Sequence, residues 1–209
     1  MSYAVKEIFP TLQGEGMQAG RRAVFLRFAG CNLWTGREED RATAVCRFCD
    51  TDFVGMDGEN GGRYDARALA AKVAALWGED RERAYVVCTG GEPLLQLDAP
   101  LIEALHGEGF EIAVESNGTI EAPKGIDWLC ISPKAGSEVV LRSGDELKLV
   151  WPQVGIDPTG FLGWNFSHFL IQPMDCAEGD KARAAAIAYV EAHPQWRLSL
   201  QTHKLLGIP

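Results

Sequence analysis

The stretch that decides the fold is Tyr85-Val86-Val87-Cys88-Thr89-Gly90-Gly91-Glu92-Pro93. Its first four residues predict a short buried strand, and the polar, glycine-rich residues after them end the strand in a turn with proline early in the next helix. The preceding residues, 66–77, place Leu69, Val73 and Trp77 at helical spacing, and a second helix is predicted around residues 101–105. A buried strand between two amphipathic helices predicts a unit of a parallel α/β sheet.

The same alternation extends outward in both directions. Further strands are predicted at residues 24–28, 110–114, 128–131, 146–150, 169–171 and 196–200, and a further helix at residues 180–192. A complete eight-unit barrel needs about 250 residues, whereas this chain has 209 residues and its first 20 lie outside the pattern. The sequence therefore predicts an α/β fold with a parallel sheet, an incomplete TIM-like barrel of about six βα units. A doubly wound open sheet is the alternative.

Composition sets the broad class of the protein. The chain is 46% apolar and 23% charged, as expected for one globular domain over residues 1–209. Its net charge of −9 argues against a dedicated nucleic-acid binder, which needs clusters of lysine and arginine. The sequence has no signal peptide and no apolar run long enough to span a membrane. We therefore expect a cytoplasmic protein without a membrane partner, whose six cysteines stay reduced.

Polar clusters containing glycine or proline follow four of the predicted strands, at residues 89–93, 115–119, 132–134 and 172–175. Parallel α/β folds place their functional sites at the carboxyl ends of the strands. Any one of these clusters reads equally well as an ordinary turn. Four in succession, each with a carboxylate, amide, hydroxyl or lysine, favour a site.

Three cysteines, Cys31, Cys46 and Cys49, have the spacing Cys-x14-Cys-x2-Cys. Three thiolates from one loop suit three irons of a cubane cluster and leave the fourth iron open. Half of a structural zinc site is an equally good interpretation of the cysteines alone, and a thioredoxin-like pair would leave Cys31 without a role. Cys88 and Cys130 lie in apolar strands and are interpreted as buried core thiols.

Motifs along the whole chain resolve this choice by resemblance. The three cysteines together with Thr89-Gly90-Gly91-Glu92-Pro93 resemble the radical S-adenosylmethionine superfamily, with eleven residues inserted into its usual Cys-x3-Cys-x2-Cys motif. Within that superfamily the chain resembles the 7-carboxy-7-deazaguanine synthase family. The motifs that carry this resemblance are Glu7-Ile8-Phe9-Pro10-Thr11-Leu12-Gln13-Gly14-Glu15-Gly16, Arg27-Phe28-Ala29-Gly30-Cys31-Asn32-Leu33-Trp34, Cys49-Asp50-Thr51, Ser132-Pro133-Lys134, Glu146-Leu147-Lys148 and Gln201-Thr202-His203-Lys204.

The resemblance implies a carbon–nitrogen lyase of queuosine biosynthesis. Such an enzyme converts 6-carboxy-5,6,7,8-tetrahydropterin to 7-carboxy-7-deazaguanine with loss of ammonia. It implies a [4Fe–4S] cluster, S-adenosylmethionine and Mg²⁺, with a 5′-deoxyadenosyl radical that abstracts hydrogen from C6 of the substrate. Since the cofactor carries the radical, no protein side chain is assigned as a catalytic residue.

The resemblance also implies roles for individual residues. The cluster ligands are Cys31, Cys46 and Cys49, and Mg²⁺ is assigned to Thr51. The S-adenosylmethionine contacts are Phe48, Cys49, Asp50, Gly90, Gly91, Glu92, Ser132, Pro133, Lys134, Gln172, Pro173, Met174 and Asp175. The substrate contacts are Leu12, Gln13, Gly14, Glu15, Arg27, Thr89, His203 and Pro209, which makes the N-terminal segment a substrate-binding extension and the C-terminal tail a closing element.

The expected partners are the pterin, a reductase such as flavodoxin or ferredoxin, and a second copy of the chain in a homodimer. Two alternatives come from other classes of protein. A glycyl-radical activating enzyme would share the cysteines and the Gly-Gly-Glu-Pro element but take a protein substrate. A zinc-stabilised binding module would use the cysteines for structure alone.

Overall fold

The computed structural model describes residues 2–209 and contains one open sheet. Its nine strands lie in the order β3-β1-β2-β4-β5-β6-β7-β8-β9. Their bounds are β1 Tyr3–Leu12, β2 Arg22–Phe28, β3 Gly62–Tyr64, β4 Tyr85–Gly90, β5 Glu111–Ser116, β6 Trp128–Ile131, β7 Ser143–Trp151, β8 Asn165–Pro173 and β9 Arg197–Leu198. In the part of this order that runs from β2 through β4 to β9, each strand is parallel to the next. Strand β1 lies between β3 and β2 and runs antiparallel to both.

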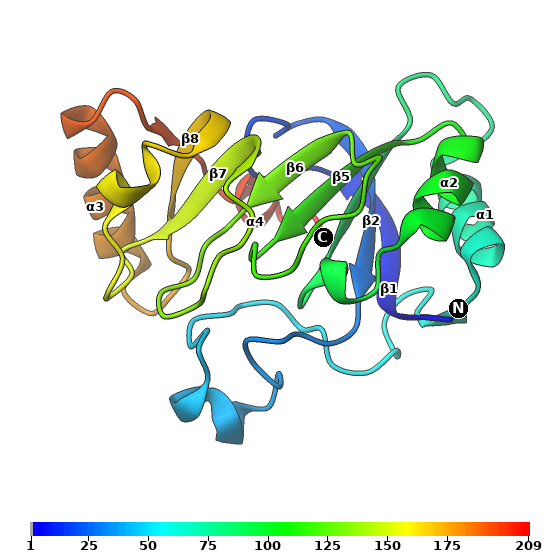
Figure 1. Cartoon of the computed structure of the whole chain (residues 1–209), viewed down its shortest axis with the longest axis horizontal. Helices are drawn as coiled ribbons and strands as arrows, with labels where there is room; N and C mark the ends of the chain where they lie inside the picture. Colours follow the sequence, from blue (N-terminus) through cyan, green and yellow to red (C-terminus); the bar gives the residue numbers. More distant parts are fainter. Residues whose placement is uncertain (1) are drawn as a thin grey trace.

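The helices are fewer than a repeating βα pattern requires. Within residues 2–209 the α-helices are α1 Ala66–Trp77, α2 Ala99–Gly107, α3 Gly179–Ala192 and α4 Thr202–Leu206, and the 3-10 helices are η1 Glu38–Thr43, η2 Pro93–Leu95 and η3 Pro158–Phe161. Figure 1 shows α1 and α2 together at one end of the sheet and α3 at the other. None of these helices combines the length and apolar character that crossing a membrane requires.

The α/β class and the mostly parallel sheet agree with the sequence prediction, whereas the finer description as an incomplete barrel of about six βα units stays a prediction. The sheet does not close, because β3 and β9 are separate edges. The links from β5 to β6 and from β6 to β7 contain no helix in the described chain. These two links are short. The apolar strands were therefore predicted correctly, whereas the links lack the helices that a repeating βα pattern contains.

Local sequence explains where α1 and α2 begin. The carboxylate of Asp65 accepts a hydrogen bond from the Ala68 amide at 2.8 Å, and Asp98 caps α2 in the same way through the Leu101 amide at 3.2 Å. Helix α1 ends at Gly78, whose positive φ of 110° suits a residue without Cβ. Predicted bounds and structure coincide at residues 66–77.

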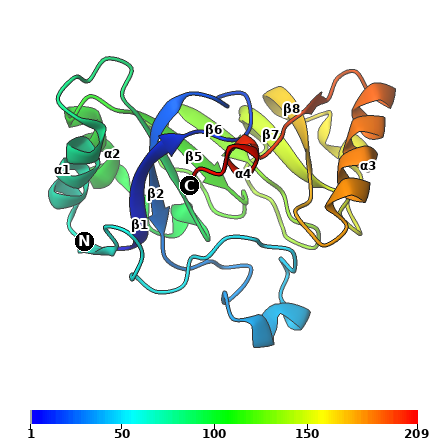
Figure 2. The same ribbon diagram turned by 180° about the vertical axis from the view of Figure 1, so that it is seen from behind.

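Two apolar clusters fill the space between helices and sheet. The larger packs α1 and α2 against β1, β2, β4 and β5, and the smaller packs α3 and Trp196 against β7 and β8. Figure 2 shows β1 and the C-terminal segment crossing the side of the sheet opposite to the view of Figure 1. Both ends of the described chain therefore contribute to one molecular face.

Ile112 in the central strand β5 is fully buried and tests this core. We expect Ile112→Ala to lower the free energy of unfolding by about 2–5 kcal/mol, because it removes buried methylenes and leaves a cavity. Urea unfolding of the metal-free protein measures this. The control is Val154→Ala, at a side chain 99% exposed, with an expected change within about 0.5 kcal/mol. Equal effects of the two variants would contradict the assigned core.

Candidate active site

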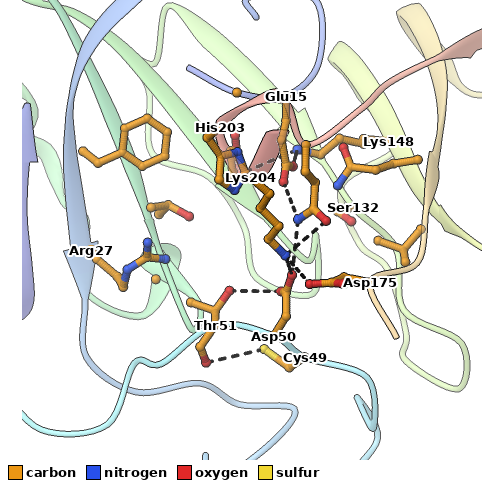
Figure 3. Close-up of a pocket in the computed structure, with 18 of the residues that line it drawn as sticks. Glu15, Arg27, Cys49, Asp50, Thr51, Ser132, Lys148, Asp175, His203 and Lys204 are labelled. Atoms are coloured by element: carbon orange, nitrogen blue, oxygen red, sulfur yellow. Dashed lines mark hydrogen bonds and ion pairs between the residues drawn. The ribbon is translucent and has the colours of Figure 1, made fainter. Parts of the chain in front are cut away.

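A cavity of about 330 Å³ opens at the carboxyl ends of the parallel strands. Most of the residues assigned from the sequence line it. These are Leu12, Gln13, Gly14, Glu15, Arg27, Cys46, Phe48, Cys49, Asp50, Thr51, Thr89, Gly90, Gly91, Ser132, Lys134, Gln172, Pro173, Asp175, His203 and Pro209. The turn after β1, the cysteine loop, four strand ends and the C-terminal tail therefore meet at one place (Figure 3).

Four assigned residues do not line the cavity: Cys31, Glu92, Pro133 and Met174. The main-chain groups of Pro133 and Met174 are paired with other parts of the chain. The Pro133 carbonyl accepts from Gln153 at 3.4 Å, and the Met174 amide donates to the Trp151 carbonyl at 2.8 Å. Their contacts with S-adenosylmethionine stay predictions.

Glu92 is fully buried, and its carboxylate joins two strand ends. One oxygen accepts from the Leu94 amide at 3.0 Å and the Ser116 hydroxyl at 2.9 Å, and the other from the Asn117 amide at 2.8 Å. Burial raises the pKa of this carboxyl. In these contacts Glu92 links the end of β4 to the end of β5, so its expected bond to the cofactor's ammonium group stays a prediction.

The three cluster cysteines are free thiols in two adjoining segments. Cys46 and Cys49 share a hydrogen bond, which lowers the pKa of Cys49. Cys31 lies within electrostatic range of Cys49, and burial raises the pKa of Cys31. No three His, Cys, Asp or Glu side chains in residues 2–209 converge as ligands of a single ion. A cubane cluster differs from a single ion because each iron takes its own thiolate.

Gly90 and Gly91 let the end of β4 lie directly against Cys31 and the residue before it. A Cβ on Gly91 would lie 2.2 Å from the Gly30 carbonyl oxygen and 2.6 Å from the Cβ of Cys31. Gly90 has a φ of 138° and faces the backbone of Phe28 in the same way. Side chains at either position are excluded by backbone, so the two glycines set the distance between Cys31 and the cavity wall.

Lys148 is a buried cation at the base of the cavity. Its ammonium group lies 2.5 Å from a Glu15 oxygen and 3.4 Å from a Glu115 oxygen. Burial alone would raise the pKa of Glu15, but Lys148 and a hydrogen bond from Gln201 lower it to about 2. Burial would lower the pKa of Lys148, but Glu115 and Glu15 raise it well above its usual value. The Glu15 carboxylate is thus anionic at neutral pH and presents a fixed acceptor to the cavity.

Arg27 offers a cation to the same cavity from strand β2. Its Nε donates to a Glu7 carboxylate at 2.7 Å. Among residues 2–209 its two terminal nitrogens have no hydrogen-bond partner. The guanidinium is therefore fixed at one edge and free to pair with an anion at the other.

The opposite wall carries Lys134, which donates to the Ser132 carbonyl at 2.7 Å and hydroxyl at 2.6 Å. Its ammonium group lies 6.0 Å from the centre of the Phe48 ring. Burial lowers the pKa of Lys134, and the nearby Cys46 and Cys49 partly oppose that shift. This wall thus combines an aromatic face with a buried amine.

The C-terminal tail completes the cavity. Thr202 donates to the Gly14 carbonyl through its amide and its hydroxyl, both at 2.9 Å. His203 covers Gly14 so closely that a Cβ there would lie 2.1 Å from the imidazole Nδ1. Lys204 joins Asp50 at 2.6 Å to Asp175 at 2.5 Å. Figure 3 shows this bridge between the cysteine loop and the end of β8.

The cavity also contains residues that were not assigned from the sequence. They are Glu7, Phe9, Phe25, Asp52, Ser116, Lys148, Val150, Gln201 and Lys204. Glu115 and Asn117, from the polar cluster that the sequence indicated at residues 115–119, line the cavity as well. Lys148 had a visible signal, because a lysine within the apolar run at residues 146–150 must find a partner. Phe9 and Phe25 had no such signal in the sequence, because nothing there indicated the antiparallel pairing of β1 with β2.

Lys148 permits a test of the buried charges. We expect Lys148→Met to lower the free energy of unfolding at pH 7 by about 3–5 kcal/mol, because two carboxylates are left without a counter-ion. The deficit relative to the parent protein should shrink as the pH falls from 4.5 toward 2. In that window the parent loses the stability that its depressed Glu15 pKa provides, whereas the variant, which lacks Lys148, does not have this stability to lose. Urea unfolding of metal-free protein at pH 7 and at about pH 2.5 measures both effects.

Lys204→Met is the control, since its ion pairs are partly exposed and we expect a loss of about 1 kcal/mol or less. A pH-independent deficit in Lys148→Met would contradict the charge arrangement.

Comparison with known proteins identifies the family of this chain. No family model matches the chain. The chain is 64% identical over 209 residues to the 7-carboxy-7-deazaguanine synthase of Bradyrhizobium diazoefficiens and 61% identical over 210 residues to that of Caulobacter vibrioides, each match covering 100% of both chains. The crystal structure of QueE from Escherichia coli matches with a TM-score of 0.73 and 27% identity, over 96% of this chain and 94% of that one. This chain belongs to the 7-carboxy-7-deazaguanine synthase family.

Proposed function

We propose that this chain converts 6-carboxy-5,6,7,8-tetrahydropterin to 7-carboxy-7-deazaguanine, with loss of ammonia, as a radical S-adenosylmethionine enzyme. The observation that carries the proposal is a single cavity with two kinds of wall. One wall has the Cys46–Cys49 turn and the bare backbone of Gly90 and Gly91. The other has Arg27 and Glu15, a cation and an anion suited to a carboxylated heterocycle.

The residues on the first wall fit the family's cofactors. Cys31, Cys46 and Cys49 are free and adjoining, as three thiolate ligands of a [4Fe–4S] cluster require. When bound, the cluster and S-adenosylmethionine supply a 5′-deoxyadenosyl radical that takes hydrogen from C6 of the substrate. The chain's own residues bind and orient: Gly90 and Gly91 line the cavity and present main-chain groups to the methionine part.

The remaining cofactor contacts are proposed at Ser132 and Lys134 for the ribose and carboxylate, and at Phe48 and residues 172–175 for the adenine. No general base is assigned, since the reaction begins with a hydrogen abstraction by the cofactor.

Substrate recognition is assigned to the second wall. The free edge of the Arg27 guanidinium suits paired hydrogen bonds to the pterin carboxylate. Glu15, anionic because of Lys148, accepts from ring N–H groups. Gln13 is 5% exposed and its amide already bonds Glu115 at 2.9 Å and the Glu15 amide at 3.0 Å. Gln13 therefore fixes the Glu115 carboxylate and the main chain at Glu15, while the neighbouring backbone and His203 enclose the ring.

Mg²⁺ is proposed at Thr51, whose hydroxyl lies 3.5 Å from a carboxylate oxygen of Asp50 in the cavity wall. Mg²⁺ prefers oxygen ligands and retains several waters. A single protein hydroxyl leaves most of the coordination to water and substrate oxygens, so the ion would join the chain to the substrate carboxylate region.

The wider setting of the enzyme is part of the proposal. Residues 1–209 act as one catalytic unit, an incomplete barrel in which the N-terminal extension and the C-terminal tail enclose the substrate. A flavodoxin or ferredoxin donates the electron, and two copies form a homodimer in which an open sheet edge gains protection. Six free thiols suit the reducing cytoplasm.

Anaerobic reconstitution with iron and sulfide tests the function. We expect a brown protein that forms 7-carboxy-7-deazaguanine, detected by mass, with dithionite, S-adenosylmethionine, Mg²⁺ and carboxytetrahydropterin. Cys31→Ala should lose most of the visible absorbance and the turnover, whereas Cys176→Ala, at an exposed thiol outside the cavity, should keep both. Cofactor cleavage without conversion of the pterin would overturn the substrate, and a colourless zinc protein would overturn the cluster.

Arg27→Gln tests recognition of the substrate carboxylate. Loss of a charge-assisted pair costs about 1.5–3 kcal/mol, so we expect KM for the pterin to rise about 10- to 100-fold while KM for S-adenosylmethionine changes little. Steady-state kinetics on reconstituted enzyme measure both constants. Arg63→Gln, at an exposed arginine on β3, is the matched control. An equal rise in both KM values would contradict the assignment of Arg27 to the substrate carboxylate.

A further inference from the structure

The insertion between the first two cluster cysteines forms a closed loop. Its ends meet at Leu33, whose carbonyl accepts from the Val45 amide at 3.1 Å and the Cys46 amide at 3.3 Å. This pairing brings Cys46 close to Cys31 although fourteen residues separate them. The rest of the insertion, with the 3-10 helix η1, projects beyond the sheet at the carboxyl ends of the strands (Figure 1).

One side chain of η1 turns back toward the cysteine ligands. The Nη1 of Arg41 donates to the carbonyl of Arg47 at 3.0 Å and to the carbonyl of Cys49 at 3.1 Å. Both carbonyls belong to the turn that holds Cys46 and Cys49. A charged donor makes stronger hydrogen bonds than a neutral one, so the insertion supplies the turn with its own fixed donor.

Arg41 is itself fixed on its remaining sides. Its Nε pairs with the Glu38 carboxylate at 2.7 Å, and its guanidinium lies over the Trp34 ring, 4.1 Å from the ring centre. Trp34 is 8% exposed, donates to the Arg37 carbonyl at 3.1 Å and packs edge-on against Phe53. The Arg41 side chain is only 27% exposed. Its conformation is therefore set before any ligand binds, which reduces the entropy cost of holding the turn.

The contacts of Arg41 join the two parts of the ligand set. Trp34 follows Cys31 by three residues, and the two carbonyls lie on the Cys46–Cys49 side. One guanidinium thus connects the segment of the first ligand to the turn of the other two, and it places a positive charge next to that turn.

We propose that Arg41 is a positioning residue that holds the Cys46–Cys49 turn in its ligand conformation and makes the bound cluster easier to reduce through its positive charge. The inference rests on the proposed cluster at Cys31, Cys46 and Cys49. Charge and hydrogen bonding around a cluster are two of the main determinants of its potential. The insertion thereby has a function: it carries the cation to the turn.

Three variants separate geometry from charge. Arg41→Gln removes both the positive charge and the planar guanidinium group. Arg41→Lys keeps the charge without the guanidinium geometry, and Arg37→Gln is the control. Arg37 lies in the same segment, is 71% exposed and has one weak ion pair at 3.9 Å.

The first measurement uses the metal-free protein and does not depend on the cluster. Amide hydrogen exchange at Val45 and Cys46 reports opening of the turn against Leu33. We expect exchange about tenfold faster in Arg41→Gln, the effect of losing about 1.4 kcal/mol of stabilisation, and parent rates in Arg37→Gln. Parent rates across β5 in every variant show that the fold is intact. Unchanged exchange at Val45 and Cys46 in Arg41→Gln would overturn the proposal.

The second measurement is the midpoint potential of the reconstituted cluster, by titration followed with electron paramagnetic resonance. We expect a more negative potential in Arg41→Gln and a value near the parent's in Arg41→Lys. Faster exchange with an unchanged potential would overturn the proposed effect on reduction, because Arg41 would then only stabilise the conformation of the loop. A parent protein that takes up no cluster would instead contradict the proposed function, while the exchange result would still report on the turn.

Discussion

The site depends on the charge balance around the buried ammonium group of Lys148. A cation at this depth requires carboxylates close by, and it takes Glu15 from a segment 133 residues away and Glu115 from the strand two places along the sheet. Glu15 in turn accepts from Gln201, which also reaches Asp50 beside the cluster turn. Five parts of the chain are thus connected by this ion-pair and hydrogen-bond network, which also leaves the Glu15 anion facing the cavity.

Much of the fold could be predicted from the sequence, because parallel strands buried on both faces give short apolar runs and amphipathic helices give a regular period. Residues 66–77 and 128–131 were placed within their observed bounds. The failures share a cause. Strand β1 carries charged residues next to apolar ones and is defined by pairing with β2 and β3, and the links around β6 are too short to contain the helices that a repeating pattern suggested. Tertiary pairing, rather than local preference, decides such segments.

The site likewise contains residues that could be predicted from the sequence and residues that could not. Residues with distinctive chemistry at strand ends, such as Gly90, Ser132 and Gln172, were brought to one cavity as the parallel topology requires. Residue types alone could not indicate that Glu92 would turn inward to bond Ser116 and Asn117, nor that Arg41 in a mixed-charge segment would reach the Cys49 carbonyl. Both depend on which backbone groups lack partners, and that is decided by three-dimensional arrangement.

The contact between Gly14 and Thr202 spans 188 residues, and it has a consequence for how the protein matures. During synthesis the three cysteines are all present in the chain once residue 49 is made, but the cavity wall that faces them waits for residues 201–209. Contacts of such long range form slowly compared with local ones. A nascent or partly folded chain therefore exposes its cysteine turn for a long interval before the cavity is enclosed. During that interval the three thiols are open to oxidation, which the enclosed cavity later restricts.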